Sequence, residues 1–297
     1  MPPSNRILPN HHGFTLIEIS IVLVIIGLVI GGVMMGKDLI EGAAIRSQIS
    51  QIEKYNAAVH TFRLQYNALP GDMNQSQANS LGFVARGDST GIMVGAGDGN
   101  GIIQGYHNTG TVSPCSSCGG AGENVFFWND LTWANGKNVN LIEGTFRPSG
   151  GGGYAGNPNP AITGSRINLW FPRAKVGNAH VYVYSYNGEN WFGLSNVTFI
   201  RWYQLSSLAS VKVSQAYAID AKVDDGLPQA GKVIAYFLNW SSTTEYAVWA
   251  GTATTAATAA SATTCYDNAN VGGAVQRYSM SVNGGNGANC GLSFKFQ

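Results

Sequence analysis

The sequence has few ionisable side chains for its length. Asp, Glu, Lys and Arg together make up 11% of 297 residues, and 17 basic residues stand against 16 acidic ones. Nucleic-acid-binding domains usually carry a basic face or stripe, and this balanced, scattered set gives no global sign of one. The charge content therefore gives no strong sign of nucleic acid as a partner, although a local basic stripe stays open.

Residue patterns that mark common catalytic sites are also scarce. The chain has 5 histidines, and His60, His107 and His180 lie far apart in the sequence. It contains neither a phosphate-binding Gly-rich loop ending in Gly-Lys-Ser/Thr nor a His-Glu-x-x-His zinc motif. We therefore expect that the protein is not an enzyme and that it needs no organic cofactor.

One long apolar run lies near the N-terminus. From Phe14 to Met35 the sequence has 22 residues, and Glu18 is the only ionisable one among them. About 20 apolar residues suffice for a helix to cross a bilayer, so the run predicts a transmembrane helix. A carboxylate inside such a helix is costly and usually has a partner. Glu18 is therefore a candidate functional residue.

The residues at the start of this run resemble the type IV prepilins and the pseudopilins of type II secretion. The resemblance is carried by the polar leader 1–13, the Gly13-Phe14 junction, the sequence Phe-Thr-Leu-Ile-Glu and the apolar tail. It implies cleavage after Gly13 by a prepilin peptidase, N-methylation of Phe14, and filament assembly that uses Glu18. The family usually has Lys or Arg just before the glycine, whereas this chain has His11 and His12.

A plain membrane anchor is the alternative reading of the same segment. In a secretory signal peptide the cleavage site follows the apolar run, but here the candidate site precedes it. An anchored monomer, however, gives no role to a carboxylate in the membrane helix.

Beyond Lys37 the apolar pattern becomes that of an amphipathic helix. Apolar residues recur at spacings of three or four, which predicts a stripe that covers a sheet. The turn Leu69-Pro70-Gly71-Asp72 then ends the helix. The predicted stripe consists of Ile45, Ile49, Ile52, Tyr55, Val59, Phe62 and Tyr66, with Arg46, Gln48, Ser50, Gln51, Glu53 and Lys54 largely on the other side.

The sequence therefore predicts an α+β, pilin-like fold. We expect a leader (1–13), a transmembrane half of the helix (14–36), an amphipathic half (37–66) and a globular head (67–297) built on an antiparallel β-sheet with long loops. Glycines at 31, 32 and 36 predict a looser stretch of helix where hydrocarbon gives way to water, because glycine is a poor helix former. Whether the helix melts between Gly31 and Gly36 stays open.

Within the head, residues 71–165 are rich in Gly, Asn, Ser and Thr and predict a long irregular connection with one or two short helices. Asn129–Ala134 is one candidate helix. Ile167–Phe171 predicts a strand, and Asn187-Gly188 between two apolar segments predicts a β-hairpin. Alternating Tyr182, Tyr184 and Tyr186 are interpreted as packing on one sheet face, with a sugar-binding platform as the alternative. A short helix is expected at 214–223.

The four cysteines form two close-spaced groups, Cys115 with Cys118 and Cys265 with Cys290. An even count outside the inner membrane favours disulfides, and pilins commonly close their C-terminal region in this way. Cys115-Ser-Ser-Cys118 also permits a redox reading, but flanking Pro and Gly favour a structural loop. Zinc would need further ligands, and the nearest histidine, His107, is single.

Two acidic segments suggest calcium. Gly97-Asp98-Gly99-Asn100-Gly101 resembles the start of a calcium loop, but Ile103 replaces the glycine that an EF-hand requires, so a tight turn is favoured. Asp220, Asp224 and Asp225 fall within six residues and are weak calcium candidates, since major pseudopilins bind calcium near their C-terminus. The Asp-Gly sequence there equally fits a helix-ending turn. No other metal is expected.

Three functions are compatible with these features. The chain is expected to be a structural subunit of a type IV pilus, anchored in the bacterial inner membrane with its head in the periplasm before it joins an extracellular filament. The alternatives are a pseudopilin of a type II secretion system and a membrane-anchored binding module that does not polymerise. The expected partners are prepilin peptidase, the assembly machinery and further copies of the chain. Roles in adhesion, motility or DNA uptake are not specified by the sequence.

Overall fold

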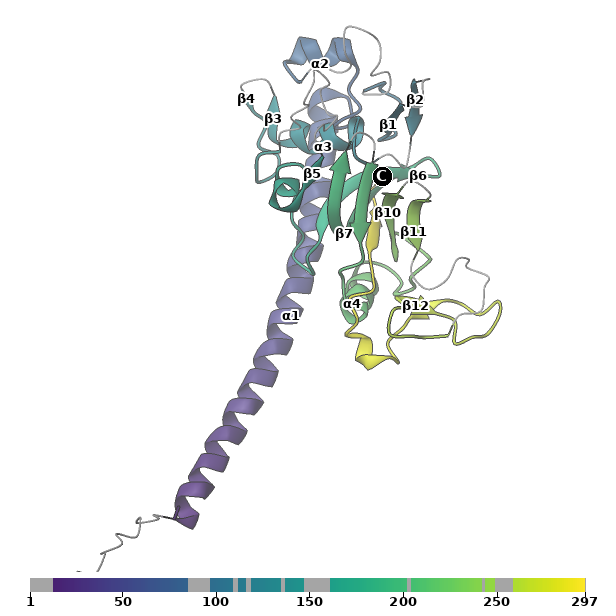
Figure 1. Ribbon diagram of the computed structural model, residues 1–297. Coiled ribbons are helices and arrows are strands. Elements are labelled where there is room, and N and C mark those ends of the chain that lie inside the picture. The colour runs from purple at the N-terminus through teal and green to yellow at the C-terminus, as the bar shows by residue number, and fades with distance from the viewer. Residues whose placement is uncertain are drawn as a thin grey trace, which may run out of the picture. The chain divides into compact units, whose positions relative to one another are not determined.

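The structure is a computed structural model, and it describes residues 13–84, 97–108, 112–115, 119–134, 137–146, 161–201, 204–241, 244–248 and 259–296. The chain divides into two compact units, Met1–Ala44 and Ile45–Gln297. The second unit is called the head below. The helices described are α1 (Leu16–Tyr66), α2 (Gln75–Leu81), α3 (Glu123–Thr132) and α4 (Val213–Val223), with short 3-10 helices η1 (Gly164–Leu169) and η2 (Asn283–Gly285) (Figure 1).

The head is built on one antiparallel sheet with the order β5-β7-β14-β9, in which β6 and β8 also pair with β7. Its strands are β5 (Ile162–Thr163), β6 (His180–Tyr186), β7 (Glu189–Arg201), β8 (Gln204–Leu208), β9 (Val233–Ile234) and β14 (Leu292–Lys295). Two-stranded pairs are β1 (Gly105–Asn108) with β2 (Val112–Cys115), β3 (Trp133–Ala134) with β4 (Lys137–Asn138), β10 (Tyr236–Ser241) with β11 (Thr244–Val248), and β12 (Tyr266–Asp267) with β13 (Arg277–Tyr278). A long N-terminal helix followed by an antiparallel sheet confirms the predicted α+β, pilin-like architecture.

Strand β7 organises this sheet. Its first part lies between β6 and β14, and its second part lies between β5 and β8. The two-residue turn Asn187-Gly188 joins β6 to β7 with positive φ angles of 52° and 78°, as a type I′ hairpin requires. The predicted hairpin is therefore confirmed.

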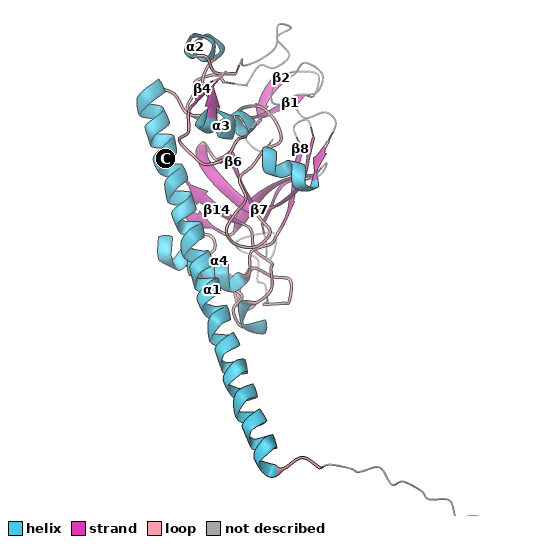
Figure 2. Cartoon of the chain, turned by 90° about the vertical axis from the view of Figure 1, so that its left-hand side faces the viewer, coloured by secondary structure: helices cyan, strands magenta, loops and turns pink. Residues whose placement is uncertain are grey.

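The distal part of α1, from Ile45 onward, packs against the rest of the head and buries one of its own faces there (Figure 2). The burial of this stripe confirms the amphipathic pattern, but placing Gln48 on the polar side is wrong. Gln48 is fully buried, and its Oε1 accepts a hydrogen bond from the backbone N–H of Lys175 at 2.7 Å. That bond offsets the cost of burying an amide. The buried residues of α1 are Ile45, Gln48, Ile52, Tyr55, Ala58, Val59 and Phe62.

Phe192 of β7 is the meeting point of the core. Its ring centroid lies 6.1 Å from that of Tyr55 on α1 and 4.2 Å from that of Phe296 near the C-terminus. Phe127 and Trp128 of α3 approach the same ring at 5.9 and 6.1 Å. Aromatic contacts of this kind stabilise a core beyond the area they bury. One side chain thus ties α1, α3, the sheet and the chain end together.

The tyrosines of β6 are part of the same head core. Tyr182 and Tyr184 are 0% and 1% exposed, so packing is confirmed and a sugar platform at these two residues is wrong. The Tyr182 hydroxyl accepts a hydrogen bond from the backbone N–H of Leu238 in β10 at 3.0 Å. A Cβ on Gly193 would lie only 2.2 Å from the Tyr182 ring. Glycine at 193 therefore makes room for that ring.

Two local predictions are wrong in instructive ways. Ile167–Phe171 was expected to be a strand, but residues Gly164–Leu169 form η1. Ile167, Trp170 and Phe171 are all buried, and their spacing of three and four places them on one side of a helical turn. The helix expected at Asn129–Ala134 is α3, which begins earlier and contains the aromatic residues 126–128. All its residues are buried, polar ones included, so it has no solvent-exposed face that would set a polar-apolar period in the sequence.

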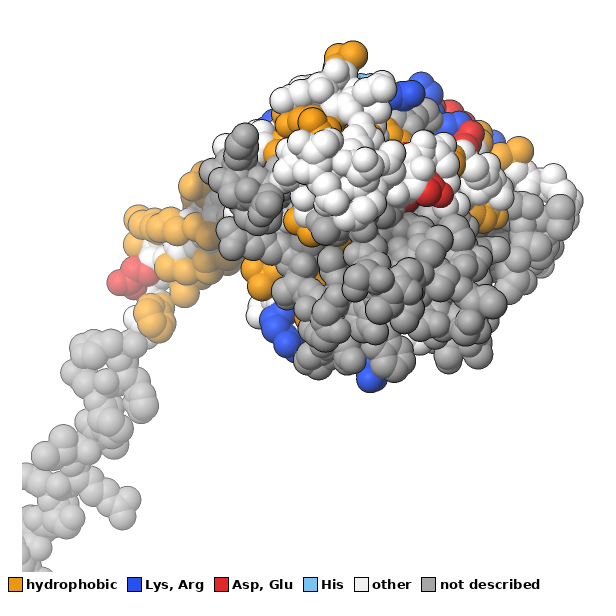
Figure 3. Space-filling view, turned by 90° about the horizontal axis from the view of Figure 1, so that it is seen from above, with side chains coloured by type: hydrophobic (Ala, Val, Ile, Leu, Met, Phe, Trp, Pro, Cys, Tyr) orange, Lys and Arg blue, Asp and Glu red, His pale blue; other side chains and the backbone are white. Residues whose placement is uncertain are grey.

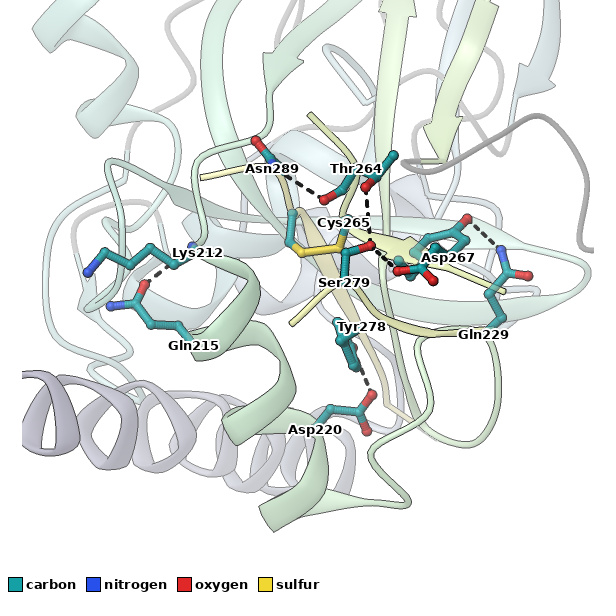
Figure 4. The surroundings of a disulfide bond; sticks show 12 residues. Lys212, Gln215, Asp220, Gln229, Thr264, Cys265, Asp267, Tyr278, Ser279 and Asn289 are labelled. Atoms are coloured by element: carbon teal, nitrogen blue, oxygen red, sulfur yellow. Dashed lines mark hydrogen bonds between the residues drawn. A yellow bond between two sulfur atoms is a disulfide. The ribbon is translucent and has the colours of Figure 1, made fainter. Parts of the chain in front are cut away.

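A disulfide joins Cys265 and Cys290, as the sequence indicates, and both residues are fully buried (Figure 4). Cys290 also exchanges two backbone hydrogen bonds of 3.0 Å with Val211, just before α4. The bridge thus ties the segment before β12 to the segment between η2 and β14. Cys118 and the side chain of Cys115 lie outside the described residues, so the staple predicted there stays a prediction.

Removing this bridge should destabilise the head. The loop it closes spans 25 residues, so the double change Cys265→Ala, Cys290→Ala should lower the free energy of unfolding by about 3 kcal/mol on the chain-entropy account. All 7 tryptophans lie in the head, so their fluorescence during guanidinium unfolding of the full chain in detergent reports this unit. Thr263→Ala, close to the bridge, is the control. An unchanged midpoint in the double variant would contradict the assignment.

Candidate functional site

The candidate site is the start of α1, where Thr15 and Glu18 cap the helix. The backbone N–H and the hydroxyl of Thr15 both donate to Oε2 of Glu18 at 2.8 Å. The backbone N–H of Glu18 donates in return to the Thr15 hydroxyl at 3.3 Å. This reciprocal pattern is a capping box, which satisfies N–H groups that a helix leaves unpaired at its first turn.

The role of Thr15 is not among the predictions made from the sequence, although the signal for it is present. Thr15-Leu16-Ile17-Glu18 has the Ser/Thr-x-x-Glu spacing that precedes a helical apolar run. Glu18 consequently has a local function besides any role between chains. It helps to start the helix, so a substitution that removes its hydrogen-bonding oxygen also alters the helix start.

The helix that follows exposes apolar side chains on all sides. Phe14 and Leu16 are 84% and 89% exposed, and large apolar residues remain exposed as far as Ile40. In the space-filling view these side chains form the orange stretch of the N-terminal segment (Figure 3). By length and composition α1 could cross a membrane. An apolar surface of this extent needs lipid or another protein surface to cover it.

The glycines in this segment do not interrupt the helix. α1 is continuous from Leu16 to Tyr66, through Gly31, Gly32 and Gly36. A Cβ placed on any of these three glycines would meet nothing within 4 Å. Space inside this chain is therefore not the reason for glycine at these positions. The structure contains an intact helix there, and whether this stretch melts in another state stays open.

Comparison with known proteins identifies the motif at this site. Residues 8–34 match the family described as the prokaryotic N-terminal methylation motif, which is the signature of type IV prepilins. Comparisons with curated proteins and with solved structures found no match.

The motif supports a type IV pilin-like or pseudopilin-like protein. It implies processing by a prepilin peptidase and an assembly machinery. Together with the apolar helix it indicates membrane anchoring before assembly.

The structure brings the three predicted calcium candidates together at the end of α4. One carboxylate oxygen from each of Asp220, Asp224 and Asp225 lies within 4.8 Å of the others. Asp220 is buried and accepts hydrogen bonds from the Tyr278 hydroxyl at 2.8 Å and the Gly226 N–H at 3.1 Å. Burial raises the pKa of Asp220 to about 7, against the effect of those two bonds. These carboxylates thus also organise the turn that follows the helix.

A second acidic group, missed as a group from the sequence, lies at the start of α3. Asp72, Asp98 and Glu123 bring carboxylate oxygens within 4.8 Å of one another, and Asp72 and Glu123 are buried. Asp72 accepts from the N–H groups of Gly99 and Gly101 at 2.9 and 2.8 Å. The sequence separates these carboxylates by 51 residues, so only the folded chain reveals the group.

Glu123 holds the same loop from the other side. It accepts from the N–H groups of Gly97 and Gln104 at 2.9 and 2.7 Å. Gly97, Gly99 and Gly101 all have positive φ angles, which confirms the predicted tight turn. The two buried carboxylates therefore anchor this turn to α3 and to the segment after α1.

These buried carboxylates predict a head that loses stability as pH rises. Burial, with Asp72 nearby, raises the pKa of Glu123 to about 9, and burial raises that of Asp72 to about 6. Both values lie above the unfolded value of about 4, so their stabilising contribution is complete below pH 4 and is lost as pH rises through 6 and then 9. The denaturant concentration at the midpoint of unfolding should therefore decrease as the pH is raised from 5 to 9.

Glu123→Gln should remove the part of this fall between pH 7 and pH 9. Glu53→Gln, at an exposed position on α1, is the matched control and should leave the profile unchanged. Tryptophan fluorescence during denaturant unfolding gives the midpoints. The assignment is wrong if the Glu123→Gln profile coincides with the wild type.

Proposed function

We propose that this chain is a structural subunit of a type IV pilus. The observation that carries the proposal is a lone carboxylate, Glu18, at the start of an apolar helix that is exposed on all sides, directly after a prepilin processing motif. The apolar surface supplies a reason to assemble. The carboxylate supplies a reason for neighbouring chains to adopt one register.

In this proposal prepilin peptidase cleaves after Gly13, and Phe14 becomes the N-methylated first residue. Its amine then donates a charge-assisted hydrogen bond to Glu18 of a neighbouring copy. Pairing the two charges offsets part of their desolvation cost in the filament interior, which a lone carboxylate would bear alone. Before assembly the chain is anchored in the bacterial inner membrane with its head in the periplasm, and afterwards it is part of an extracellular pilus.

The large disulfide-closed head supports a pilus subunit rather than a major pseudopilin, which is usually much smaller. The convergence of Asp220, Asp224 and Asp225 is the observation that favours the pseudopilin alternative, because major pseudopilins bind calcium near their C-terminus.

Calcium at this group stays a prediction. If it binds, 1 mM calcium should raise the unfolding midpoint of the wild type relative to EGTA by mass action, and Asp225→Asn should abolish the rise. Equal midpoints would count against a calcium site.

Processing has a direct chemical signature. The mature chain should begin at Phe14 and carry one methyl group, so intact-mass spectrometry of the membrane fraction should show the mass of residues 14–297 plus that group. In a strain without the peptidase the full-length mass should persist. An uncut leader in the wild-type strain would remove the proposal.

The role of Glu18 in assembly can be separated from its role in the helix cap. Glu18→Gln removes the charge but keeps a residue that fits a capping box, and we expect it to reduce filament yield at least about tenfold while membrane insertion and leader cleavage persist. Thr15→Val breaks the cap but keeps the carboxylate, and should assemble far better. Leu16→Val, which changes volume without changing charge, should assemble nearly normally.

Yields are compared by immunoblotting sheared surface fractions against whole cells. If Glu18→Gln assembles like the wild type while Thr15→Val does not, the cap rather than the charge matters. If the sheared surface fraction of the wild type contains no filaments and neither substitution changes that fraction, the anchored-module alternative is favoured.

A further inference from the structure

The head contains a groove that the processing and assembly functions do not use. It runs along α1 from Ser47 to Thr61 and has a volume of about 750 Å³. Fourteen residue steps correspond to about 21 Å along a helix. Small-molecule sites typically enclose about 300–1,000 Å³. The groove is thus large enough for an extended ligand of several ring-sized units.

One wall of the groove is fixed to α1 by two side-chain amides, of which Gln48 is buried and Gln51 half-buried. Gln48 accepts from the backbone N–H of Lys175 at 2.7 Å. Gln51 donates from Nε2 to the backbone carbonyl of Arg173 at 2.9 Å and to the Tyr55 hydroxyl at 2.8 Å. These bonds hold the segment that presents Lys175 in place. Little ordering is then required when a ligand binds.

The opposite wall, residues 140–144, is fixed to α3. The backbone N–H of Leu141 donates to the carbonyl of Leu131 at 3.0 Å, and that of Val139 donates to Thr132 at 3.1 Å. Ile142 is buried and anchors the wall from within, whereas Asn140 and Glu143 are exposed along it. The groove is therefore formed by three separate segments that the fold holds together.

The charges in the groove favour an anionic ligand. Lys54 and Lys175 line it together with a single carboxylate, Glu143. Both lysine side chains belong to exposed residues, so their ammonium groups can reach a ligand. Polar groups also line the groove over its length, from the hydroxyls of Ser47, Ser50 and Thr61 to the amide of Asn140.

We propose that this groove binds an acidic saccharide, a hydroxyl-rich chain that carries carboxylates. The carboxylates would accept charge-assisted hydrogen bonds from Lys54 and Lys175. The sugar hydroxyls would donate to Glu143 and exchange hydrogen bonds with the hydroxyl and amide side chains of the lining. C–H faces of the sugar rings would rest on Ala57, Ala58 and Leu141.

An acidic peptide fits the same groove less well. Peptides that bind in extended form usually add to an exposed sheet edge or insert apolar anchors into pockets. The residues that line this groove come from α1, the 140–144 segment and Lys175, and no described strand contributes an edge. The apolar lining that the structure describes consists of small and aliphatic side chains and of Tyr55, which is only 7% exposed. The proposal concerns the head alone and does not depend on whether the chain polymerises.

The test uses the full chain in detergent and isothermal titration calorimetry with trigalacturonate. Maltotriose is the neutral saccharide control, and a triglutamate peptide is the acidic peptide control. We expect binding of trigalacturonate and at least about tenfold weaker binding of both controls. The paired change Lys54→Ala, Lys175→Ala should weaken trigalacturonate at least about tenfold. Lys222→Ala with Lys232→Ala, two exposed lysines outside the groove, should leave binding unchanged.

Glu143→Gln is the complementary variant, because it removes the one carboxylate among the described lining residues and should tighten trigalacturonate binding severalfold. This gain of affinity cannot arise from a misfolded head. The proposal is overturned if wild-type protein does not bind trigalacturonate, if the groove variants bind it as the wild type does, or if triglutamate binds more tightly. Filament formation can be intact or absent in any of these outcomes, so the two proposals are tested separately.

Discussion

An uncovered apolar helix is the constraint on which this account depends. Between Phe14 and Met35 the side chains on every side of α1 are exposed, and Glu18 is the single ionisable group among them. Covering one large aliphatic side chain is worth about 1.5–3 kcal/mol, so the segment as a whole strongly favours lipid or other copies over water. Lipid satisfies the apolar residues but supplies no positive charge to pair with Glu18. A filament in which a neighbour supplies an amine satisfies both.

The distal half of the same helix meets the opposite requirement. Tyr55 and Phe62 are buried against aromatic side chains of the head, and Gln48 and Gln51 hydrogen-bond to the backbone near residue 174. These contacts make the second half of α1 part of the head core, with Phe192 at its centre. The first half of α1 thus presents an apolar surface to its surroundings, and the second half packs a buried stripe against its own domain.

The sequence predicts the parts of this structure whose signals are local. The apolar run, the stripe from Ile45 to Phe62 and the Asn187-Gly188 hairpin each depend on periodicity or turn chemistry within a short segment. The capping box of Thr15 and Glu18 also has a local signal, the Thr-x-x-Glu spacing, but it is not among the predictions made from the sequence. Where three-dimensional packing decides, the sequence misleads: Gln48 looks like a surface residue until the backbone of Lys175 supplies its partner. Helix α3 is buried on all sides, its polar residues included, so no alternation of exposed and buried positions marks its boundaries in the sequence.

The candidate sites divide in the same way. Gly13, Phe14 and Glu18 can be predicted from the sequence because a processing motif is contiguous. The groove along α1 and the group formed by Asp72, Asp98 and Glu123 are not, because they join segments that are far apart in the chain and only the fold brings them together.

The measurement that tests the central claim most directly is electron microscopy of material sheared from the cell surface and labelled with an antibody raised against the head. The account predicts long filaments labelled along their length, because every subunit presents a head. Cells that label at the envelope while their sheared fraction contains no labelled filaments would contradict a pilus subunit and favour a pseudopilin or an anchored monomer.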